Sequence, residues 1–288
     1  MNKLNILLPL YNDWRSLNSL LKKINNELKN TNRYVKILVL NDSSTQKINI
    51  IYKKLKFIKK IKVLTTYKNL GSQKIISIGL NYIKNKKNEL IVVMDSDGED
   101  DVSYLSTLID ESTKRRDSVI VAKRTKRKEN FLFKLLYKFH LVITFFLTMK
   151  WISFGNYSCF HSRHLKKILK NNLSWLAYSS CVMKNCNIFK VDSERQKRIF
   201  GKSKLSFFGL FKHSFRILSV FQIKILLIST LYVLIALFFG KIKLFFTIEN
   251  VFVLALIILN FIVFITKKNT LKDYSQKNNY IKTIDIIK

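Results

Sequence analysis

The most informative part of the sequence reads Leu90-Ile-Val-Val-Met-Asp95-Ser96-Asp97-Gly98-Glu99-Asp100-Asp101. Its apolar residues indicate a fully buried strand, and the acidic residues begin where that strand has to end. In α/β proteins, ligands bind at this carboxyl edge of the sheet. The Asp-x-Asp spacing of Asp95 and Asp97 suits a hard divalent cation, which takes oxygen ligands and keeps other positions for water and substrate phosphates. An acidic turn that caps the following helix is the alternative interpretation.

The charge balance makes this acidic run unusual. The chain of 288 residues has 52 Lys and Arg against 18 Asp and Glu, a formal net charge of +34 at pH 7. Such a surplus implies a polyanionic partner or an anionic membrane surface. Five of the 18 acids lie between Asp95 and Asp101. Because acids are scarce elsewhere, their gathering here favours a local role such as metal binding over general solubility.

The cysteines and the amino-terminal residues bear on the cellular compartment. Cys159, Cys181 and Cys186 have no Cys-x-x-Cys spacing, so the sequence predicts neither a disulfide framework nor a zinc site. The apolar run 4–10 is too short for the core of a signal peptide. We therefore expect a reducing compartment and a first domain in the cytosol.

The first 125 residues alternate strand-like and helix-like runs. Strands are expected at residues 4–10, 35–40, 61–66, 90–94 and 118–122, and helices between them at 14–28, 46–57, 72–83 and 104–115. This order predicts an α/β fold with a mostly parallel, doubly wound sheet, helices on both faces and a ligand at the carboxyl ends of the strands. No Gly-x-Gly-x-x-Gly follows the first strand and no P-loop motif is present, which disfavours dinucleotide enzymes and P-loop ATPases.

The ends of these strands carry a resemblance to a known family. The motifs are Leu7-Leu8-Pro9-Leu10-Tyr11-Asn12-Asp13, Val39-Leu40-Asn41-Asp42-Ser43-Ser44, Asn69-Leu70-Gly71, Asp95-Ser96-Asp97 and Arg198-Ile-Phe-Gly201-Lys-Ser203-Lys204. In this order they resemble the family 2 glycosyltransferases, which have the Rossmann-like GT-A fold. Within that family the chain is most similar to the polyprenyl-phosphate sugar transferases, the subgroup typified by dolichol-phosphate mannose synthase and bactoprenol glucosyltransferases. The similarity covers residues 3–219.

The resemblance implies roles for individual residues. Donor contacts are implied for Pro9, Tyr11, Asp13, Asp42, Asp95 and Ser96, catalytic roles at the diphosphate for Asp97, Arg124 and Arg198, and a phosphate contact for Lys204. Asp97 would bind a divalent metal, Mg²⁺ or Mn²⁺. Other interpretations stay open: Asp42 as a helix cap, Arg124 as one solvated charge in the basic run 123–128, and Arg198 with Lys204 as a membrane-surface patch.

Three positions depart from the family pattern. The second strand ends in Asn41-Asp42, where the family has paired acids, so we expect one nucleoside contact to differ. Glu99 stands two residues after the metal-binding Asp, where relatives often have Gln. As a second metal ligand, Glu99 would add negative charge and strengthen metal binding. Asn156 stands where relatives often have an acid, and it cannot act as a base. A sugar hydroxyl has to lose a proton to attack, whereas a phosphate oxygen is already ionised.

The last third of the chain is membrane-like. Residues 220–239 and 248–265 are mostly apolar and near the length that spans a bilayer. We expect a transmembrane helical hairpin over 220–266, after a glycosyltransferase domain of residues 1–219. Lys and Arg gather before the first stretch and in the basic tail 267–288, which by the positive-inside rule places the catalytic domain on the cytoplasmic side of the inner membrane. A soluble helical hairpin buried in a core is the alternative.

A further apolar segment precedes this region. Residues 131–149 mix apolar side chains with Lys134, Lys138 and His140. This composition is typical of an interfacial amphipathic helix, which would place the active site beside lipid headgroups at the cytoplasmic leaflet. A third spanning helix is the alternative, disfavoured by the two lysines in the first half of the segment.

Together these features predict an inverting glycosyltransferase of the hexosyltransferase class. The partners expected are a nucleotide-sugar donor, a polyprenyl or dolichyl phosphate acceptor and membrane lipid. The alternatives are a membrane glycosyltransferase that acts on a hydroxyl of a cell-surface glycan or lipid, and a non-catalytic membrane-binding module. Nucleic acid is not expected, because the aromatic residues gather in the hydrophobic stretches and not among the basic residues. The sugar, the nucleotide, the metal and a homo-oligomeric state are left open.

Overall fold

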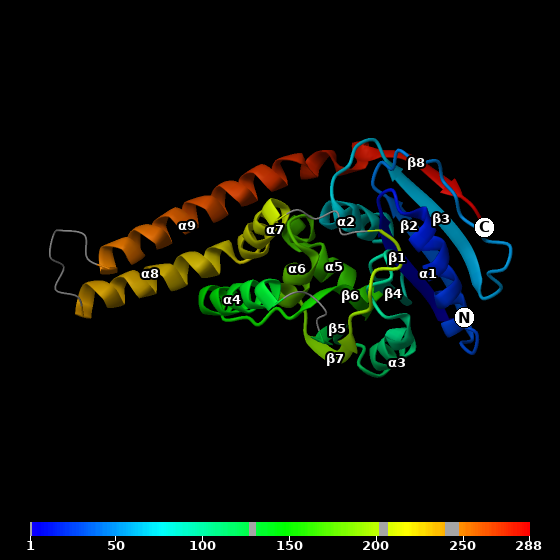
Figure 1. The fold of residues 1–288 in the computed structure, drawn as a ribbon, viewed down its shortest axis with the longest axis horizontal. Helices are drawn as coiled ribbons and strands as arrows, with labels where there is room; N and C mark the ends of the chain where they lie inside the picture. Colours follow the sequence, from blue (N-terminus) through cyan, green and yellow to red (C-terminus); the bar gives the residue numbers. More distant parts are fainter. Residues whose placement is uncertain (1, 127–130, 202–206, 240–247) are drawn as a thin grey trace.

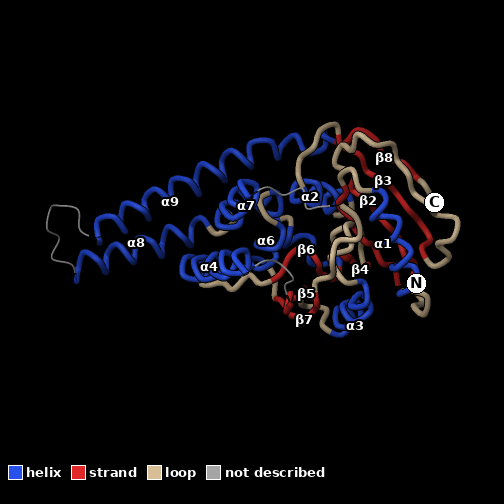
Figure 2. The backbone as a smooth tube through the Cα atoms, in the orientation of Figure 1, coloured by secondary structure: helices blue, strands red, loops and turns tan. Residues whose placement is uncertain are grey.

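The structure, a computed structural model, describes residues 2–126, 131–201, 207–239 and 248–288 (Figure 1). A globular α/β part carries a long pair of helices, α8 (Gln222–Phe239) and α9 (Ile248–Leu271), which extends away from it. Within the described chain, the globular part is built on an eight-stranded sheet with the order β7-β5-β6-β4-β1-β2-β3-β8. Figure 2 distinguishes the strands of this sheet from the helices packed against it.

Four neighbouring strands form the parallel centre of the sheet. They are β3 (Ile58–Thr66), β2 (Arg33–Asn41), β1 (Asn2–Leu10) and β4 (Glu89–Val93). β6 (Phe154–His161) runs antiparallel to β4 and to β5 (Val119–Lys126), and β7 (Ile188–Glu194) lies parallel to β5. Because the central strands point the same way, their carboxyl ends meet at one edge of the sheet.

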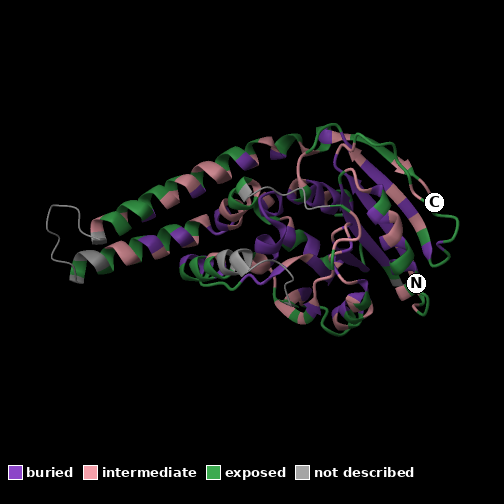
Figure 3. Cartoon of the chain, in the orientation of Figure 1, coloured by how far each residue is buried: buried purple, intermediate pink, exposed green. Residues whose placement is uncertain are grey.

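Apolar side chains fill both faces of the sheet, which explains why its strands are nearly continuous hydrophobic runs. All residues of β4 are buried, and in Figure 3 the central strands are mostly coloured as buried. Alternate residues of β1 enter different cores. Ile6 and Leu8 pack with α1 (Trp14–Glu27) and α3 (Leu105–Lys114), whereas Leu7 packs with α2 (Ser72–Tyr82) and α6 (Tyr178–Asn185).

The structure confirms the expected strands and the expected helices at 14–28, 72–83 and 104–115, with small shifts at their ends. The helix expected at 46–57 is wrong, because the connection between β2 and β3 contains none. Asparagine side chains accept hydrogen bonds from its backbone N–H groups, in the pairs Asn12 with Thr45 and Gln46, Asn18 with Ile51, and Asn25 with Phe57. Backbone groups satisfied in this way do not need a helix.

Several further elements complete the fold. The helices are α4 (Phe131–Thr148), α5 (Leu165–Ile168) and α7 (Phe207–Ser219), with short 3₁₀ helices η1 (Val102–Tyr104), η2 (Ser162–His164), η3 (Lys170–Trp175) and η4 (Lys272–Tyr280). The stretch 267–288 was expected to be a basic tail. It instead contains the end of α9, η4 and β8 (Ile281–Ile286), and β8 pairs antiparallel with β3 at the edge of the sheet.

The helix pair exposes many apolar side chains. More than half of the surface is exposed for Ile223, Leu226, Leu227, Leu231 and Leu234 in α8, and for Val251, Leu254, Ile257 and Phe261 in α9. Of the described residues, one helical stretch, 250–280, is long and apolar enough to span a membrane. The segments 208–219 and 222–235, bent by 84°, would add a second if they form one span. The transmembrane hairpin, the interfacial placement of α4 and the domain boundaries stay predictions.

Replacing Asn25 with Ala tests how the β2–β3 connection is held. The buried Asn25 side chain accepts a hydrogen bond from Phe57 N–H, so its loss leaves that N–H without its partner. We expect Asn25→Ala to lower the free energy of unfolding by about 1–3 kcal/mol. The matched control is Asn26→Ala, an exposed neighbour in the same helix. Equal stabilities of the two variants in chemical unfolding would contradict this account.

Candidate active site

The ends of β1, β2 and β4 bring most of the predicted site residues to one edge of the sheet. The Ser96 hydroxyl donates to the Pro9 carbonyl at 2.6 Å, which joins the end of β1 to the acidic run. Asp42 N–H donates to the Leu10 carbonyl at 2.8 Å, which joins the end of β2 to the same place. Tyr11 lies in this region with 37% of its surface exposed.

The acidic run folds into a tight turn that holds its own carboxylates together. Asp95 N–H donates to the Asp100 carboxylate at 2.9 Å, and Glu99 N–H donates to that of Asp97 at 3.0 Å. Burial, and then the nearby Asp100, raises the pKa of Asp95 to about 6. Burial, and then the nearby Asp95, raises the pKa of Asp97 to about 6. These carboxyl groups are therefore crowded and poorly solvated, an environment that attracts a cation.

Arg198 lies between two of the predicted site residues. Its guanidinium donates to the Asp13 carboxylate at 2.7 Å and to the Asp97 carboxylate at 3.2 Å. Asp13 also caps α1 by accepting from Ser16 N–H. The side chains of Arg198, Asp13 and Asp97 are all less than one-fifth exposed. Charge-assisted bonds of this kind are the stronger hydrogen bonds in proteins, and here they join the first helix to the acidic turn.

Two further arginines contact the same turn. Arg124, at the end of β5, donates to the buried Asp100 carboxylate at 3.4 Å. Its guanidinium lies over Gly155, where an added Cβ would come within 2.8 Å of it. Arg195 pairs with the Glu99 carboxylate. The turn thus has cations on several sides.

Backbone contacts explain why the segment 195–199 follows the acidic turn. Gln196 N–H donates to the Glu99 carbonyl and Ile199 N–H to the Asp97 carbonyl, at 2.9 and 3.0 Å. Gly98 makes this approach possible: its φ is +82°, and an added Cβ would lie 2.4 Å from the Ile199 side chain. Lys204, the last residue of the predicted phosphate segment, lies outside the described residues.

Asp42 organises the loop that precedes α2. Its two carboxylate oxygens accept from Leu70 N–H at 2.8 Å and from Gly71 N–H at 2.7 Å. Burial raises the pKa of Asp42, although these two donors oppose the rise. Asp42 therefore does not cap a helix directly after β2; it holds the Asn69-Leu70-Gly71 motif beside the site.

Asn156 faces the acidic turn from β6. The register that pairs Val93 with Ser158 places Asn156 opposite Asp95, and its amide donates to Asp95 at 2.9 Å. The Asn156 oxygen accepts from Gln73 at 3.2 Å, and the Gln73 oxygen accepts from Tyr178 N–H at 2.6 Å. A backbone N–H can only donate, so this chain of bonds fixes both amides with the Asn156 NH₂ toward Asp95.

The oxygen ligands at this turn suit the predicted Mg²⁺ or Mn²⁺. Each carboxylate oxygen can accept more than one bond, so Asp97 keeps capacity for a ligand beside its contacts to Glu99 N–H and Arg198. No three His, Cys, Asp or Glu side chains converge as a metal cage within the part of the chain that is described. A cation here would complete its shell with substrate phosphates and water. Glu99 is already neutralised by Arg195, and its metal role stays a prediction.

Sequence reasoning missed three residues of this arrangement: Asp100, Arg195 and Gln73. Asp100 belongs to the acidic run, but the sequence pattern did not predict that its side chain is buried. Arg195 carried a usable signal, because it lies close in sequence to Arg198 and five crowded acids require several cations. Gln73 gave no signal, since its role depends on Tyr178 N–H, more than a hundred residues away.

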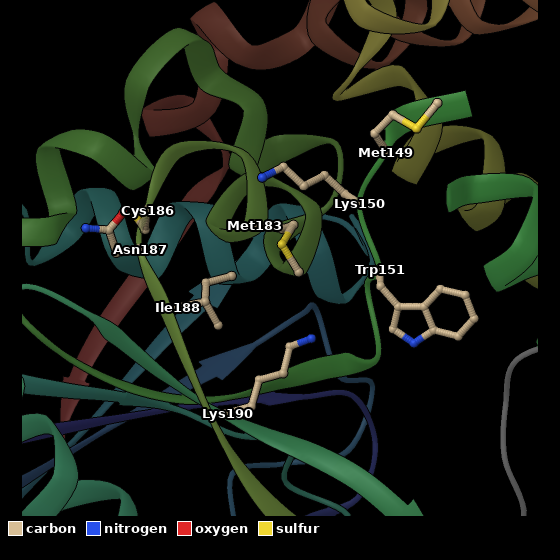
Figure 4. A pocket seen from close by; sticks show the side chains of 8 residues that line it. All are labelled: Met149, Lys150, Trp151, Met183, Cys186, Asn187, Ile188 and Lys190. Carbon is tan, nitrogen blue, oxygen red and sulfur yellow. The ribbon is translucent and has the colours of Figure 1, made fainter. Parts of the chain in front are cut away.

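Figure 4 shows a separate pocket. It is lined by Met149, Lys150, Trp151, Met183, Cys186, Asn187, Ile188 and Lys190. These residues come from the chain that follows α4, from α6, from β7 and from the link between those two, and the lining includes none of the predicted site residues. The candidate active site is therefore the open edge of the sheet and not this pocket.

Replacing Gly98 with Ala tests the contact between the acidic turn and the segment 195–199. Gly201→Ala is the control, because Gly201 also has a positive φ (+72°) but its added Cβ would meet nothing within 4 Å. We expect Gly201→Ala to cost about 1–2 kcal/mol of backbone strain and Gly98→Ala to cost clearly more, measured by unfolding. Adding Ile199→Ala should recover part of the difference. Equal costs for both glycines would show that Ile199 does not press on Gly98.

Known proteins are similar to this chain in sequence. The sequence profile described as Glycosyl transferase family 2 matches residues 5–173. An uncharacterized glycosyltransferase of Bacillus subtilis (strain 168), YkcC, is 28% identical over 130 residues. Those residues are 45% of this chain and 39% of the relative, so the match spans less than half of the relative's length.

Solved structures are also similar to this chain. Glucosyl-3-phosphoglycerate synthase from Mycobacterium tuberculosis, in complex with UDP, has a TM-score of 0.53 and 11% identity, covering 78% of this chain and 80% of that one. S. aureus TarS 1–349 has a TM-score of 0.49 and 14% identity, covering 95% and 91%. The first likeness supports an α/β fold of the GT-A type. Because the family profile covers more than half of the chain, including the ends of β1, β2 and β4, the protein belongs to glycosyl transferase family 2.

Proposed function

We propose that the protein transfers a sugar, with inversion, from a nucleotide-diphosphate sugar to a polyprenyl phosphate at the cytoplasmic face of a membrane. The observation that carries this proposal is the bond from the Asn156 amide to Asp95. At this position, where relatives often have an acid, the chain presents a fixed N–H donor and no base. An acceptor that is already ionised, such as a phosphate, fits a site without a base at this position.

The donor would lie along the ends of β1, β2 and β4. Pro9, Tyr11, Asp13 and Asp42 are proposed to contact the nucleoside, with Asp95 and Ser96 facing the ribose or the sugar. A structural neighbour of the same fold was solved with UDP, which is in line with a uridine nucleotide. In the structure, Arg198 bridges Asp13 and Asp97. An entering diphosphate would replace these carboxylates as the partner of its guanidinium.

The chemistry is a single displacement at the anomeric carbon. The bond from that carbon to the nucleotide's phosphate oxygen breaks, the leaving diphosphate keeps the electron pair, and an acceptor phosphate oxygen forms the new bond from the opposite side. A divalent cation held by Asp97, with Glu99 nearby, would neutralise charge on the diphosphate. Arg124 and Arg198 are placed to stabilise the same charge, because both lie against the acidic turn.

Exposed apolar helices support a membrane setting. α4 exposes Phe139, Phe145 and Phe146, α7 exposes Phe208 and Phe211, and α8 and α9 expose the side chains named above. So much exposed apolar surface is unusual for a soluble monomer and marks a membrane or partner contact. The flanking lysines and arginines favour the cytoplasmic side for the catalytic domain.

A second acceptor class has its own support. Asp95 is a carboxylate that the Asn156 amide holds beside the proposed sugar position, and a carboxylate placed there can act as a general base. Such a base would allow a hydroxyl of a cell-surface glycan or lipid to attack. The two acceptor classes are separated by incubating membranes that contain the protein with radiolabelled sugar nucleotides and extracting the lipid phase. A labelled lipid that is cleaved by mild acid supports the phosphate acceptor, and label confined to glycan or to acid-stable lipid contradicts it.

Replacing Asp97 with Asn tests the metal ligand. We expect turnover to fall by about 100-fold or more, because the charge that holds the cation at the diphosphate is lost. Asp117→Asn is the control, since Asp117 is an exposed acid paired with Arg163 far from the site. Near-normal, metal-dependent turnover by the Asp97 variant would remove Asp97 from the metal site.

Replacing Asn156 with Ala separates the two acceptor classes by rate. With a phosphate acceptor, the loss should stay within about tenfold, below the 10²-fold or more typical of a removed general base. The measurement is kcat and both Michaelis constants in detergent. A collapse of kcat in this variant would instead indicate that Asn156 positions Asp95 as the base for a hydroxyl acceptor.

A further inference from the structure

The chain returns from α9 to the catalytic domain through residues 272–288, here called the return segment. η4 follows α9 directly, and β8 then joins the sheet beside β3 (Figure 1). The pairing runs from Lys62 opposite Ile286 to Thr66 opposite Ile281. Lys288 continues the contact by accepting from Ile61 N–H at 3.0 Å. The return segment thus pairs with residues 61–66 of β3, the part of that strand nearest the donor loop.

A buried tryptophan fixes the return segment on the domain. Trp175, fully buried in η3, contacts Tyr274 edge-on at 5.4 Å between ring centroids and stacks with Tyr280 at 6.3 Å. Lys74 of α2 lies 5.2 Å from the Trp175 ring and pairs with Asp273 at 3.5 Å. Aromatic pairs in such geometry stabilise beyond their buried area. The segment is therefore attached by side chains as well as by the β-ladder.

One residue of the return segment touches the loop beside the candidate site. Tyr67 N–H donates to the Tyr280 carbonyl at 2.9 Å, and the Lys68 ammonium lies 4.8 Å from the centre of the Tyr280 ring. The loop 67–71 is the one whose Leu70 and Gly71 N–H groups bind Asp42. This loop is held at its start by Tyr280 and at its end by Asp42.

Tyr274 has the same burial and the same aromatic partner but a different neighbour. Both tyrosines are 9% exposed and both contact Trp175. The Tyr274 hydroxyl, however, is bonded to Asn81 on α2 at 3.3 Å, away from the loop 67–71. The two residues therefore separate general packing from loop placement.

We propose that Tyr280 is a positioning residue of the donor site. By fixing the start of the loop 67–71, it keeps the Leu70 and Gly71 N–H groups in place for Asp42, and so it couples the helix pair to donor binding. The link to donor binding rests on the function proposed above, in which Asp42 faces the nucleoside. The link to the loop rests on the contacts alone.

The test uses full-length protein in detergent and the variants Tyr280→Ala, Tyr280→Phe and Tyr274→Ala. Amide hydrogen exchange of the loop 67–71 is the first readout and needs no substrate. Tyr280→Ala keeps the carbonyl that accepts from Tyr67 N–H but removes the ring that stacks with Trp175 and lies beside Lys68, so the carbonyl is no longer held in place. We therefore expect this variant to speed the exchange about tenfold. Tyr280→Phe should leave the exchange unchanged because the ring remains, and Tyr274→Ala should lower the melting temperature without speeding the exchange. Equal exchange in the Tyr280→Ala and Tyr274→Ala proteins would overturn the proposal.

Steady-state kinetics are the second readout. Tyr280→Ala should raise the KM of the sugar nucleotide by about three- to tenfold, with kcat and the KM of the lipid phosphate within about twofold of the unchanged protein. Fast loop exchange with an unchanged donor KM would overturn the coupling to donor binding. If the unchanged protein transfers no sugar from any nucleotide, the proposed function fails, and the exchange data still decide the loop placement. Should Tyr280→Ala not fold, Tyr280→Leu, which keeps apolar volume without the ring, is judged by the same criteria.

Discussion

Crowding of carboxylates at the end of one buried strand is the constraint on which the rest of the site depends. Asp95, Asp97 and Asp100 are poorly solvated, and their neighbouring negative charges repel one another. The turn is compatible with folding because Arg124, Arg195 and Arg198 surround it. Those cations come from β5 and from the chain that leaves β7. The two outer strands thus belong to the catalytic edge as much as the parallel centre does.

Much of this architecture could be predicted from local sequence. The apolar runs and the polar residues after them define the central strands and the edge where Asp13, Asp42 and Asp97 meet. The helix expected at 46–57 did not form because asparagines just before α1 and on α1 accept hydrogen bonds from its backbone N–H groups. β6, β7 and β8 have short or mixed patterns, and their pairing is decided by partners distant in sequence.

The site residues show the same division between local and distant information. Asp97 and Arg198 were visible as motifs, and the structure adds that they contact each other. The direction of the Asn156 amide was not accessible, because it depends on Gln73 and finally on one backbone N–H of α6. Amide orientation is a property of a whole hydrogen-bond chain, and no single residue in that chain encodes it.

The return of the chain to the sheet has a mechanical consequence. The helix pair is attached to the globular part twice, through α7 where it leaves and through η4 and β8 where it comes back. A body tethered by one linker can swivel, whereas two separate attachments remove that freedom. With α8 and α9 in a bilayer, the catalytic edge would sit at a set height and tilt above the lipid surface. Selection among acceptors could then depend on how far a headgroup reaches out of the membrane.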